Sequence, residues 1–170
     1  MNITIRSEEP GDIPSIAALA KVSDRDEKRP GPRHHEIIDG LRADEQLWLS
    51  LVAVNMDQAV IGHIGLAEVA MPDGARGWYA VAPVSVMPTR QSTGIGGALV
   101  NAAVTEARNA GARGLMVIGR PELSARFGCA PDPRLSVAKV EPERFQIFPF
   151  SGDVPTGVVV YPAAFGHATG

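Results

Sequence analysis

The sequence predicts an α+β (α/β) fold in which a mixed, mostly antiparallel central sheet is flanked by helices. Residues 47–86 form an apolar, β-branched series that is interrupted twice by turn-forming residues, a pattern typical of an antiparallel meander. A strongly helical pattern begins at Ile95 and is followed by the short apolar segment 115–118. A helix followed so closely by a strand indicates a local parallel crossover, which would make the sheet mixed.

The N-terminal part predicts one strand and two helices. Ile3 and Ile5 alternate as in a strand, and Gly11-Asp12 offers a helix start. Residues 23–33 are polar and basic with two prolines, so we expect a mobile connection there. The apolar residues of the two helices recur at helical spacing: Ile13, Ile16, Ala17 and Ala20 in the first, and Ile37, Ile38 and Leu41 in the second.

Three consecutive strands are predicted at residues 47–54, 58–69 and 78–86. They are separated by Asn55-Met56-Asp57 and Pro72-Asp73-Gly74, residue types that favour turns. Pro83 lies within the third of these strands. Because proline is excluded from a regular central ladder, the strand is expected to be bulged at this point or to lie at an edge of the sheet.

The C-terminal half predicts a long helix, a short strand, a short helix and a hairpin. The long helix has an alanine-rich face and stops at Asn109-Ala110-Gly111. Residues 121–127 suit a short helix closed by Gly128, and residues 145–150 and 157–161 are interpreted as a final hairpin. The sequence shows no internal repeat or linker, so we expect one domain over residues 1–170, with fraying from residue 163 onward.

Composition limits the function classes. The chain has 170 residues, 21% of them charged, and a formal net charge of −3, which disfavours general nucleic-acid binding. Apolar runs stay short of the roughly 18 residues that span a bilayer, and the N-terminus lacks the build of a signal peptide, so we expect a cytoplasmic protein. Cys129 is the single cysteine, which excludes an internal disulfide and fits a reducing compartment.

The most informative motif is the glycine-rich stretch that leads into the long helix. A strand that runs through a tight turn into a helix start leaves backbone N–H groups unpaired, which suits a diphosphate. A Walker loop is excluded because Gly97 is followed by Ala98 and Leu99 instead of Lys and Ser or Thr. A dinucleotide-binding fingerprint is disfavoured by the glycine spacing and by the position past mid-chain. The motif reads Gln91, Ser92, Thr93, Gly94, Ile95, Gly96 and Gly97.

This motif, preceded by a strand that ends in Val86-Met87-Pro88, resembles motif A of the GNAT superfamily of acyl-CoA-dependent N-acyltransferases. The resemblance extends along nearly the whole chain. Further segments are similar to the YhbS-type subgroup of predicted acetyltransferases: Glu36-Ile37-Ile38-Asp39-Gly40-Leu41-Arg42, Leu49-Ser50-Leu51-Val52-Ala53, Ala82-Pro83-Val84-Ser85-Val86-Met87-Pro88, Ala125-Arg126-Phe127-Gly128 and Val158-Val159-Val160-Tyr161-Pro162-Ala163-Ala164-Phe165. The resemblance implies the GNAT fold and acetyl-CoA as cosubstrate.

The resemblance also implies the coenzyme site. The strand segment Val84, Ser85 and Val86 would hold pantetheine through its backbone, and the motif residues 91–97 would hold the diphosphate. Ser92 and Thr93 replace the usual Gly and Lys or Arg, so the loop adds hydroxyl groups but no positive charge. Nearby Arg90 could contact the ribose phosphate, although an exposed surface arginine is the simpler explanation of it.

The reaction also needs an acid that protonates the departing thiolate. Many members of the superfamily place a Tyr on the short helix, and the corresponding residue here is Ser124. Serine is a much poorer acid than a phenol with a pKa near 10. Three alternatives follow: Ser124 orients groups or relays a proton through water, the thiolate leaves without a specific acid, or the domain binds coenzyme A without efficient turnover.

Three residues are candidates for the base that accepts a proton from the amine. Glu68 and His63 lie on the strand predicted at residues 58–69, and Glu36 lies on the second helix. Period-two alternation puts Ile61, His63, Gly65 and Ala67 on one strand face and Gly62, Ile64, Leu66 and Glu68 on the other, unless a bulge intervenes. We rank Glu68 ahead of His63.

No metal site is predicted, because the adjacent His34 and His35 have no partner ligands at useful spacing. Cys129 is interpreted as a small buried group, which disfavours a ping-pong mechanism. Together with the loop motif, the resemblance implies an N-acetyltransferase that uses acetyl-CoA by direct transfer in a ternary complex, with a small-molecule or peptide amine as acceptor. The alternatives are a noncatalytic acyl-CoA sensor and a transferase for protein N-termini or aminoacyl-tRNA. An exposed C-terminal hairpin could support a homodimer.

Overall fold

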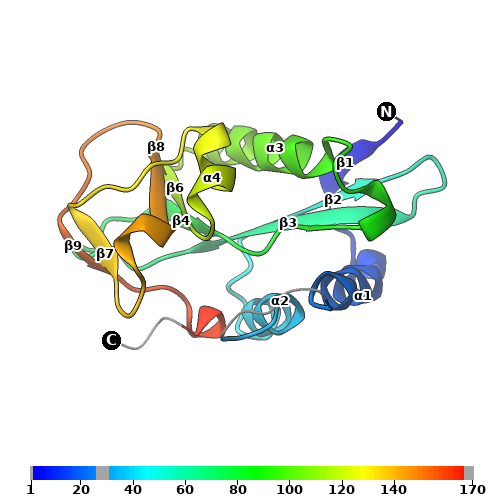
Figure 1. Ribbon diagram of the computed structural model, residues 1–170, viewed down its shortest axis with the longest axis horizontal. Coiled ribbons are helices and arrows are strands. Elements are labelled where there is room, and N and C mark those ends of the chain that lie inside the picture. Colours follow the sequence, from blue (N-terminus) through cyan, green and yellow to red (C-terminus); the bar gives the residue numbers. More distant parts are fainter. Residues whose placement is uncertain (1, 26–30, 167–170) are drawn as a thin grey trace.

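A seven-stranded mixed sheet forms the centre of the protein (Figure 1). The structure is a computed structural model, and it describes residues 2–25 and 31–166. The strand order is β1-β2-β3-β4-β6-β8, and β5 pairs with β3 beyond the end of β4. The strands are β1 (Thr4–Ser7), β2 (Leu49–Val54), β3 (Val60–Glu68), β4 (Trp78–Val81), β5 (Ser85–Val86), β6 (Gly114–Ile118) and β8 (Phe145–Pro149).

Neighbouring strands of this sheet are antiparallel except for β4 and β6, which are parallel. The parallel pair arises because α3 (Ile95–Asn109) carries the chain across the sheet between β5 and β6. The predicted mixed, mostly antiparallel sheet and its local crossover are therefore confirmed.

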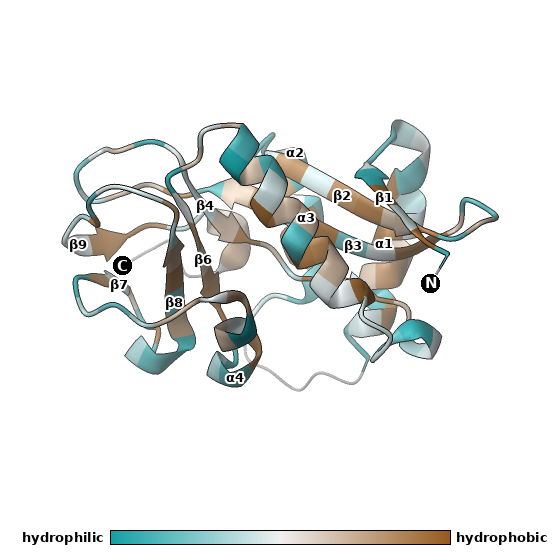
Figure 2. Ribbon diagram, turned by 90° about the horizontal axis from the view of Figure 1, so that it is seen from above, coloured by the Kyte–Doolittle hydropathy of each residue, from teal (hydrophilic) through white to brown (hydrophobic). Residues whose placement is uncertain are grey.

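Helices cover both faces of the sheet. α3 and the short α4 (Pro121–Ser124) lie over one face, and α1 (Ile13–Ser23) and α2 (His34–Ala43) lie over the other (Figure 1). Two hydrophobic clusters fill the layers. The α3 layer buries Ile95, Leu99, Ala103 and Ala107 against strands β2 and β3, and the α1–α2 layer extends to Tyr161 and Phe165 near the C-terminus. Figure 2 shows that the strands are predominantly hydrophobic, as expected for a sheet covered on both faces.

The predicted turns of the meander are present. The Asn55 side chain accepts hydrogen bonds from the N–H groups of Asp57 (3.0 Å) and Ala59 (2.9 Å), which closes the turn between β2 and β3. In the next turn, the N–H of Gly74 donates to the Met71 carbonyl at 3.0 Å. Gly74 has φ +76°, a conformation that L side chains rarely adopt.

The connection between α1 and α2 is tied at both ends by Asp24. Its carboxylate accepts hydrogen bonds from the backbone N–H groups of His34 (2.7 Å) and His35 (3.2 Å) at the start of α2. Burial, the largest single effect, raises the pKa of Asp24, but the hydrogen bond with His35 and those from the two N–H groups hold it below its usual value. The predicted mobile connection falls partly on residues 26–30, which lie outside the described residues.

The predicted C-terminal hairpin is wrong. β8 pairs antiparallel with β6, and β9 (Gly157–Val159) instead pairs parallel with β7 (Leu135–Val137) in a separate two-stranded sheet. Apolar alternation marks a segment as a strand but does not select its partner, and both partners here lie earlier in the chain. The side chains of Val158 and Val160 are about half exposed, and a homodimer through this region stays a prediction.

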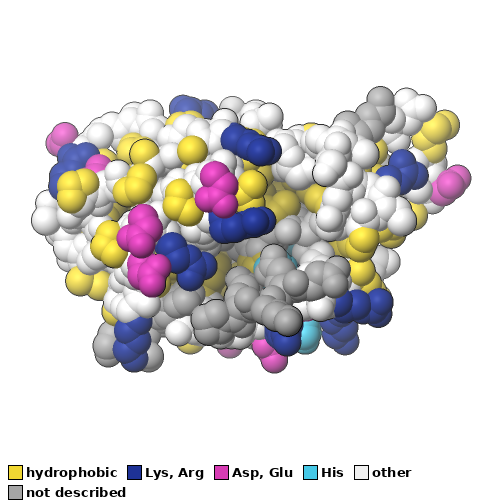
Figure 3. All heavy atoms as spheres, viewed as in Figure 1, with side chains coloured by type: hydrophobic (Ala, Val, Ile, Leu, Met, Phe, Trp, Pro, Cys, Tyr) yellow, Lys and Arg dark blue, Asp and Glu magenta, His cyan; other side chains and the backbone are white. Residues whose placement is uncertain are grey.

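Two surface properties bear on the expected class of protein. Within residues 2–25 and 31–166, no helix combines the length and the apolar character needed to cross a membrane. On the face shown in Figure 3, acidic and basic side chains are interspersed instead of forming separate patches.

Replacing Gly114 with Ala is expected to destabilise the protein by about 2 kcal/mol, a typical cost of overpacking. An added Cβ would lie 2.5 Å from the Trp78 ring and 2.8 Å from the Phe148 carbonyl oxygen, and the backbone oxygen cannot move without disturbing the β6–β8 ladder. Urea denaturation measures the effect. Gly11→Ala is the control, because its Cβ would meet nothing within 4 Å. Equal stability of the two variants would contradict the prediction.

Candidate active site

The strand that leads to the glycine-rich loop carries a β-bulge. Leu66 pairs with Val81, whereas His63 pairs with Ser85, so three steps along β3 correspond to four steps along the opposite strand. The extra residue falls at Pro83–Val84, opposite Ile64. Pro83 therefore occupies a bulge, one of the two placements that its sequence predicts.

The bulge coincides with a split in the sheet. β4 and β6 pair only from Trp78 and Gly114 to Ala80 and Met116, after which β5 follows β3 and β6 continues beside β8. In the described part of the chain, β5 has no partner strand on the side of β6. A cavity of about 220 Å³ occupies this region on the α3–α4 side. Its lining is mostly apolar: Val81, Val84, Val100, Val104, Leu115, Met116, Val117, Gly119, Arg120, Leu123, Ser124, Phe127, Cys129 and Phe148. We call it the cleft.

The glycine-rich loop ends at the uncapped N-terminus of α3. Gly94 precedes the helix with φ +91°, and no side chain caps it. The first intrahelical bond runs from the N–H of Ala98 to the Gly94 carbonyl at 3.0 Å. The N–H groups of Ile95, Gly96 and Gly97 therefore have no acceptor within the helix. Together with the helix dipole they form a site suited to an anion.

The loop side chains brace the loop. Gln91 donates from its amide to the Val86 carbonyl at 3.2 Å, and the Thr93 hydroxyl donates to the Arg90 carbonyl. The Thr93 hydroxyl proton is thus already engaged. Gly96 and Gly97 keep the start of α3 open, since an added Cβ would come no closer than 3.8 Å to Val86 and 4.0 Å to Phe127, respectively.

The predicted coenzyme residues are contiguous in space, but their side chains divide between the two faces of the sheet. Val84 lines the cleft, and Val86 packs with the α3 layer. Ser85 lies between them, is buried and pairs with His63. Ser85 can therefore serve the cleft only through its backbone.

Ser124 lies at the cleft and is held by Gln146. Its hydroxyl is 2.8 Å from the Gln146 carbonyl oxygen and 3.2 Å from the Arg120 carbonyl, so its single proton has two acceptors within reach. Gln146 is almost completely buried on β8, and its amide nitrogen lies 3.4 Å from the Glu143 carbonyl. Sequence reasoning missed Gln146, although a polar residue between Phe145 and Ile147 in an apolar strand is a usable signal.

The structure does not bring Glu68 to Ser124. Glu68 pairs with Tyr79, four residues along β3 from the bulge, which corresponds to about 13 Å at the usual strand rise. Its carboxylate binds Arg76 through two hydrogen bonds of 2.5 and 2.8 Å, and these hold its pKa below the usual value. It lines a different cavity, of about 460 Å³, beside Trp48.

Glu36 caps a helix: its carboxylate accepts a hydrogen bond from the Arg33 N–H at 2.6 Å, in a capping box at the start of α2. Of the three candidate bases, only His63 lies next to the bulge.

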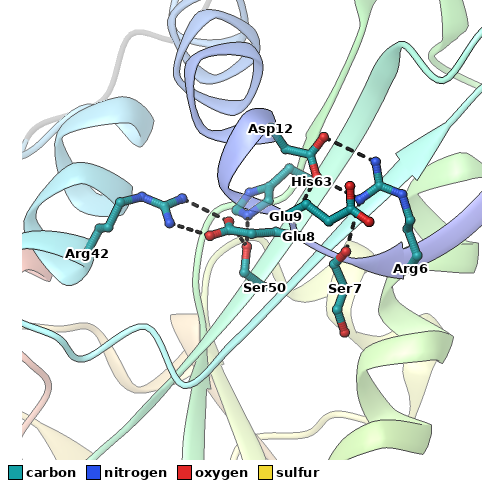
Figure 4. A network of polar contacts seen from close by, with 8 residues as sticks. All are labelled: Arg6, Ser7, Glu8, Glu9, Asp12, Arg42, Ser50 and His63. Atoms are coloured by element: carbon teal, nitrogen blue, oxygen red, sulfur yellow. Dashed lines mark hydrogen bonds and ion pairs between the residues drawn. The ribbon is translucent and has the colours of Figure 1, made fainter.

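His63 is buried in a polar network that four segments build (Figure 4). Its Nε2 lies 2.8 Å from the Ser50 hydroxyl, which in turn lies 2.5 Å from Oε1 of Glu8. Arg42 of α2 binds Glu8 through both carboxylate oxygens. Burial lowers the pKa of His63 from 6.5 to about 4; the charge of Glu8 opposes this shift, and that of Arg42 adds to it. The sequence offers no spacing signal that links Glu8, Arg42 and Ser50.

β3 departs from strict alternation near its start. The register of β2 against β3 shifts between Ala53 and Val54, and Ile61 packs with the α3 layer. The predicted common face of Ile61 and His63 is therefore wrong, because Ile61 is the extra residue of a bulge opposite Ala53 and Val54. The separation of His63 from Glu68 across the sheet holds.

The surroundings of Cys129, His34 and His35 do not indicate a catalytic thiolate or a metal site. Cys129 is half-buried at the cleft, and burial raises the pKa of its thiol, which disfavours a thiolate. His34 and His35 begin α2 beside Asp24, with Nδ1 of His35 at 2.6 Å from its carboxylate. The described residues contain no group of three or more His, Cys, Asp or Glu side chains that could hold a metal ion.

Comparisons with known proteins agree with this architecture. The model of the Acetyltransferase (GNAT) family matches residues 14–126. A Brucella melitensis GNAT acetyltransferase crystallised with acetyl-CoA is 36% identical, with a TM-score of 0.80 over 96% of this chain and 98% of that one. Escherichia coli YhbS, crystallised with CoA, is 25% identical in the structural comparison, with a TM-score of 0.85 over 98% and 93% of the two chains.

The same E. coli protein, described as an uncharacterised N-acetyltransferase, is 29% identical over 124 residues, which cover 73% of this chain and 71% of the relative. The family match spans more than half of the chain and includes the bulge, the loop, α3 and Ser124. The resemblance that the motifs suggest is thereby confirmed. The chain belongs to the GNAT acetyltransferase family.

Proposed function

We propose that this protein is an acetyl-CoA-dependent N-acetyltransferase that transfers the acetyl group directly to an amine in a ternary complex. The observation that supports it best is the junction of three features: the bulged strand, the hydrophobic cleft and the uncapped start of α3. In this junction an apolar slot leads to a group of free N–H donors. The related proteins from B. melitensis and E. coli, which were crystallised with acetyl-CoA and CoA, support the same assignment.

The residues present fit acetyl-CoA. The N–H groups of Ile95, Gly96 and Gly97 would hold the diphosphate, and the glycines leave room for it. Gln91 and Thr93 would keep the loop in place, while Ser92 and Gly94, both with positive φ, set its course. The free side of the strand at Val84, Ser85 and Val86 would pair with the pantetheine amides. When bound, the coenzyme supplies an activated acetyl carbonyl.

The reaction joins the amine nitrogen to the acetyl carbonyl carbon and breaks the carbon–sulfur bond. The amine loses a proton and the sulfur gains one, so the products are an amide and a thiol. The protein's part is to hold both reactants, to keep water away with the apolar lining of the cleft, and to move these protons. We propose that Ser124 orients a water or the sulfur and does not itself act as the acid. The acceptor would be a small-molecule or peptide amine.

Ser124→Ala is expected to change kcat by less than about tenfold, below the 10² to 10⁴-fold typical of a direct acid or base. The hydroxyl is a weak acid and is already hydrogen-bonded to Gln146. Ser124→Tyr is expected to raise kcat, because a phenol is a better acid. Steady-state kinetics measures both, and calorimetry with CoA confirms that binding is kept. A loss of 10²-fold or more in Ser124→Ala would make Ser124 the proton donor.

The replacement of Tyr by Ser124 favours one alternative, a noncatalytic acyl-CoA sensor. Incubation of the protein with acetyl-CoA and a panel of primary amines separates the two functions. An enzyme is expected to acetylate at least one class of amine well above the uncatalysed rate. Tight binding of CoA with only slow hydrolysis of acetyl-CoA would favour the sensor, and absence of CoA binding at millimolar concentration would overturn both.

A further inference from the structure

The Glu8–Ser50–His63 network has a defined proton arrangement. Arg42 pairs with Glu8, and although burial raises the pKa of this carboxyl, hydrogen bonds from Arg42 and Ser50 hold it below the usual value, so Glu8 is ionised. An ionised carboxylate can only accept, so Ser50 donates its single proton to Glu8. The Ser50 oxygen must then accept from Nε2 of His63. His63 is consequently the Nε2–H tautomer, with a free electron pair on Nδ1.

The position of this imidazole relates it to the proposed reaction. His63 pairs with Ser85, directly beside the bulge at Pro83–Val84. Its side chain lies on the α1–α2 face, opposite the α3–α4 face that holds the cleft and Ser124. In the reaction proposed here, the amine approaches the bulge from the α1–α2 face, the side on which the buried His63 lies, and the thiol leaves on the other face.

The charges around His63 come from a few segments. Glu8, which follows β1, and Arg42 of α2 are the charged groups that affect it. α1 packs on β3 and β5 and carries Lys21, which is exposed, and β5 carries no charged residue. The Arg6–Asp12 pair lies nearby in Figure 4 but has no bond to Ser50 or His63.

We propose that His63 is the residue that takes the proton lost by the acceptor amine, at Nδ1, and that Ser50 and Glu8 are positioning residues that fix its tautomer and orientation. This inference rests on the proposed function. The amine proton passes to Nδ1 as the nitrogen–carbon bond forms, and the imidazolium is balanced by Glu8 through Ser50. The proton then returns to solvent from Nδ1, which restores the Nε2–H tautomer held by Ser50 and Glu8.

The test combines a titration of His63 with a pH–rate profile. Both are measured in two variants that are expected to shift the pKa of His63 in opposite directions. Glu8→Gln keeps the shape and removes the negative charge, so the pKa of His63 should fall. Arg42→Gln removes the positive charge, so the pKa of His63 should rise by about one unit. Nitrogen-15 NMR of the labelled imidazole reports tautomer and pKa without any activity. Asp12→Asn is the matched control and should leave both unchanged.

The rates should follow the titration. Because Arg42→Gln raises the pKa of His63, the variant should lose its base at a higher pH than the wild type does. The ratio of the Arg42→Gln rate to the wild-type rate should therefore drop as the pH falls. Protonation of the amine affects both rates equally and does not change this ratio. His63→Gln should lower kcat/KM by about 10²-fold with CoA affinity kept.

The failures can be told apart. Three results would overturn the role of His63 alone. These are an Nδ1–H tautomer in the NMR spectrum, a His63→Gln variant that folds and transfers acetyl at the wild-type rate, and a rate ratio whose pH dependence does not follow the pKa measured by NMR. Absence of acetyl transfer by the wild-type protein to every amine would overturn the proposed function and the role of His63 with it.

Discussion

Gly96→Asp is expected to weaken the binding of CoA by about 10²-fold relative to Gly96→Asn. The two side chains have the same shape, so the comparison isolates one negative charge at the start of α3. At about 5 Å from a phosphate charge and an effective dielectric constant near 20, the repulsion is about 3 kcal/mol, and each 1.4 kcal/mol is a factor of ten. Isothermal titration calorimetry with CoA measures the difference.

Folding should not obscure this result. An added Cβ at Gly96 would meet only Val86, at 3.8 Å, and an acidic residue in the first turn interacts favourably with the helix dipole. Asn101→Asp places the same charge further along α3 at an exposed position and serves as a control for net charge. If Gly96→Asp and Gly96→Asn bind CoA equally, the diphosphate does not lie at this helix start.

The free energy of unfolding is expected to be about 2 kcal/mol lower at pH 5 than at pH 7 because of His63. The reason is that the pKa of this residue is about 4 in the folded protein and 6.5 in the unfolded chain. Below pH 6.5 the unfolded chain binds a proton on this residue, whereas the folded chain resists it until about pH 4. Stability therefore falls as the pH decreases through this window and rises again toward neutral pH. Chemical denaturation at several pH values measures the dependence.

Two variants test the source of this dependence. His63→Gln should remove about 2 kcal/mol of the difference between pH 5 and pH 7, whatever its effect on absolute stability. Glu8→Gln should keep that slope, because Glu8 has a lowered pKa and its stabilising effect is present above about pH 4.5 and is lost only as the pH falls further. An unchanged slope in His63→Gln would show that other groups cause the acid sensitivity.

The parts of the fold that local chemistry controls are predictable from the sequence. The turn at Asn55, the buried face of α3, the short helix closed by Gly128 and the exposed amides before α3 all depend on residues close together in the chain. Pro83 indicates a bulge or an edge strand, because proline has no N–H to donate to a neighbouring strand. The coenzyme part of the candidate site was for this reason predicted as one contiguous stretch.

The proton-transfer part of the site was not predictable in the same way. Glu68 and His63 share a strand, and the sequence analysis ranks Glu68 first. In the structure, Glu68 forms an ion pair with Arg76, whereas His63 is oriented by Ser50, which is hydrogen-bonded to Glu8. The wrong hairpin has the same origin, because the partners of β8 and β9 come from earlier segments that no local pattern identifies.

The sequence by itself determined the strand and helix segments, the anion-binding loop and the family, since these follow from periodicity, turn chemistry and a motif of neighbouring residues. Only the tertiary structure decided which strands pair, how the sheet opens into a cleft, and which ionisable groups meet at the bulge. The physical reason is that hydrogen bonds and charge interactions act over a few ångströms in space, and residues as distant in the chain as Glu8 and His63 come within that range only after folding.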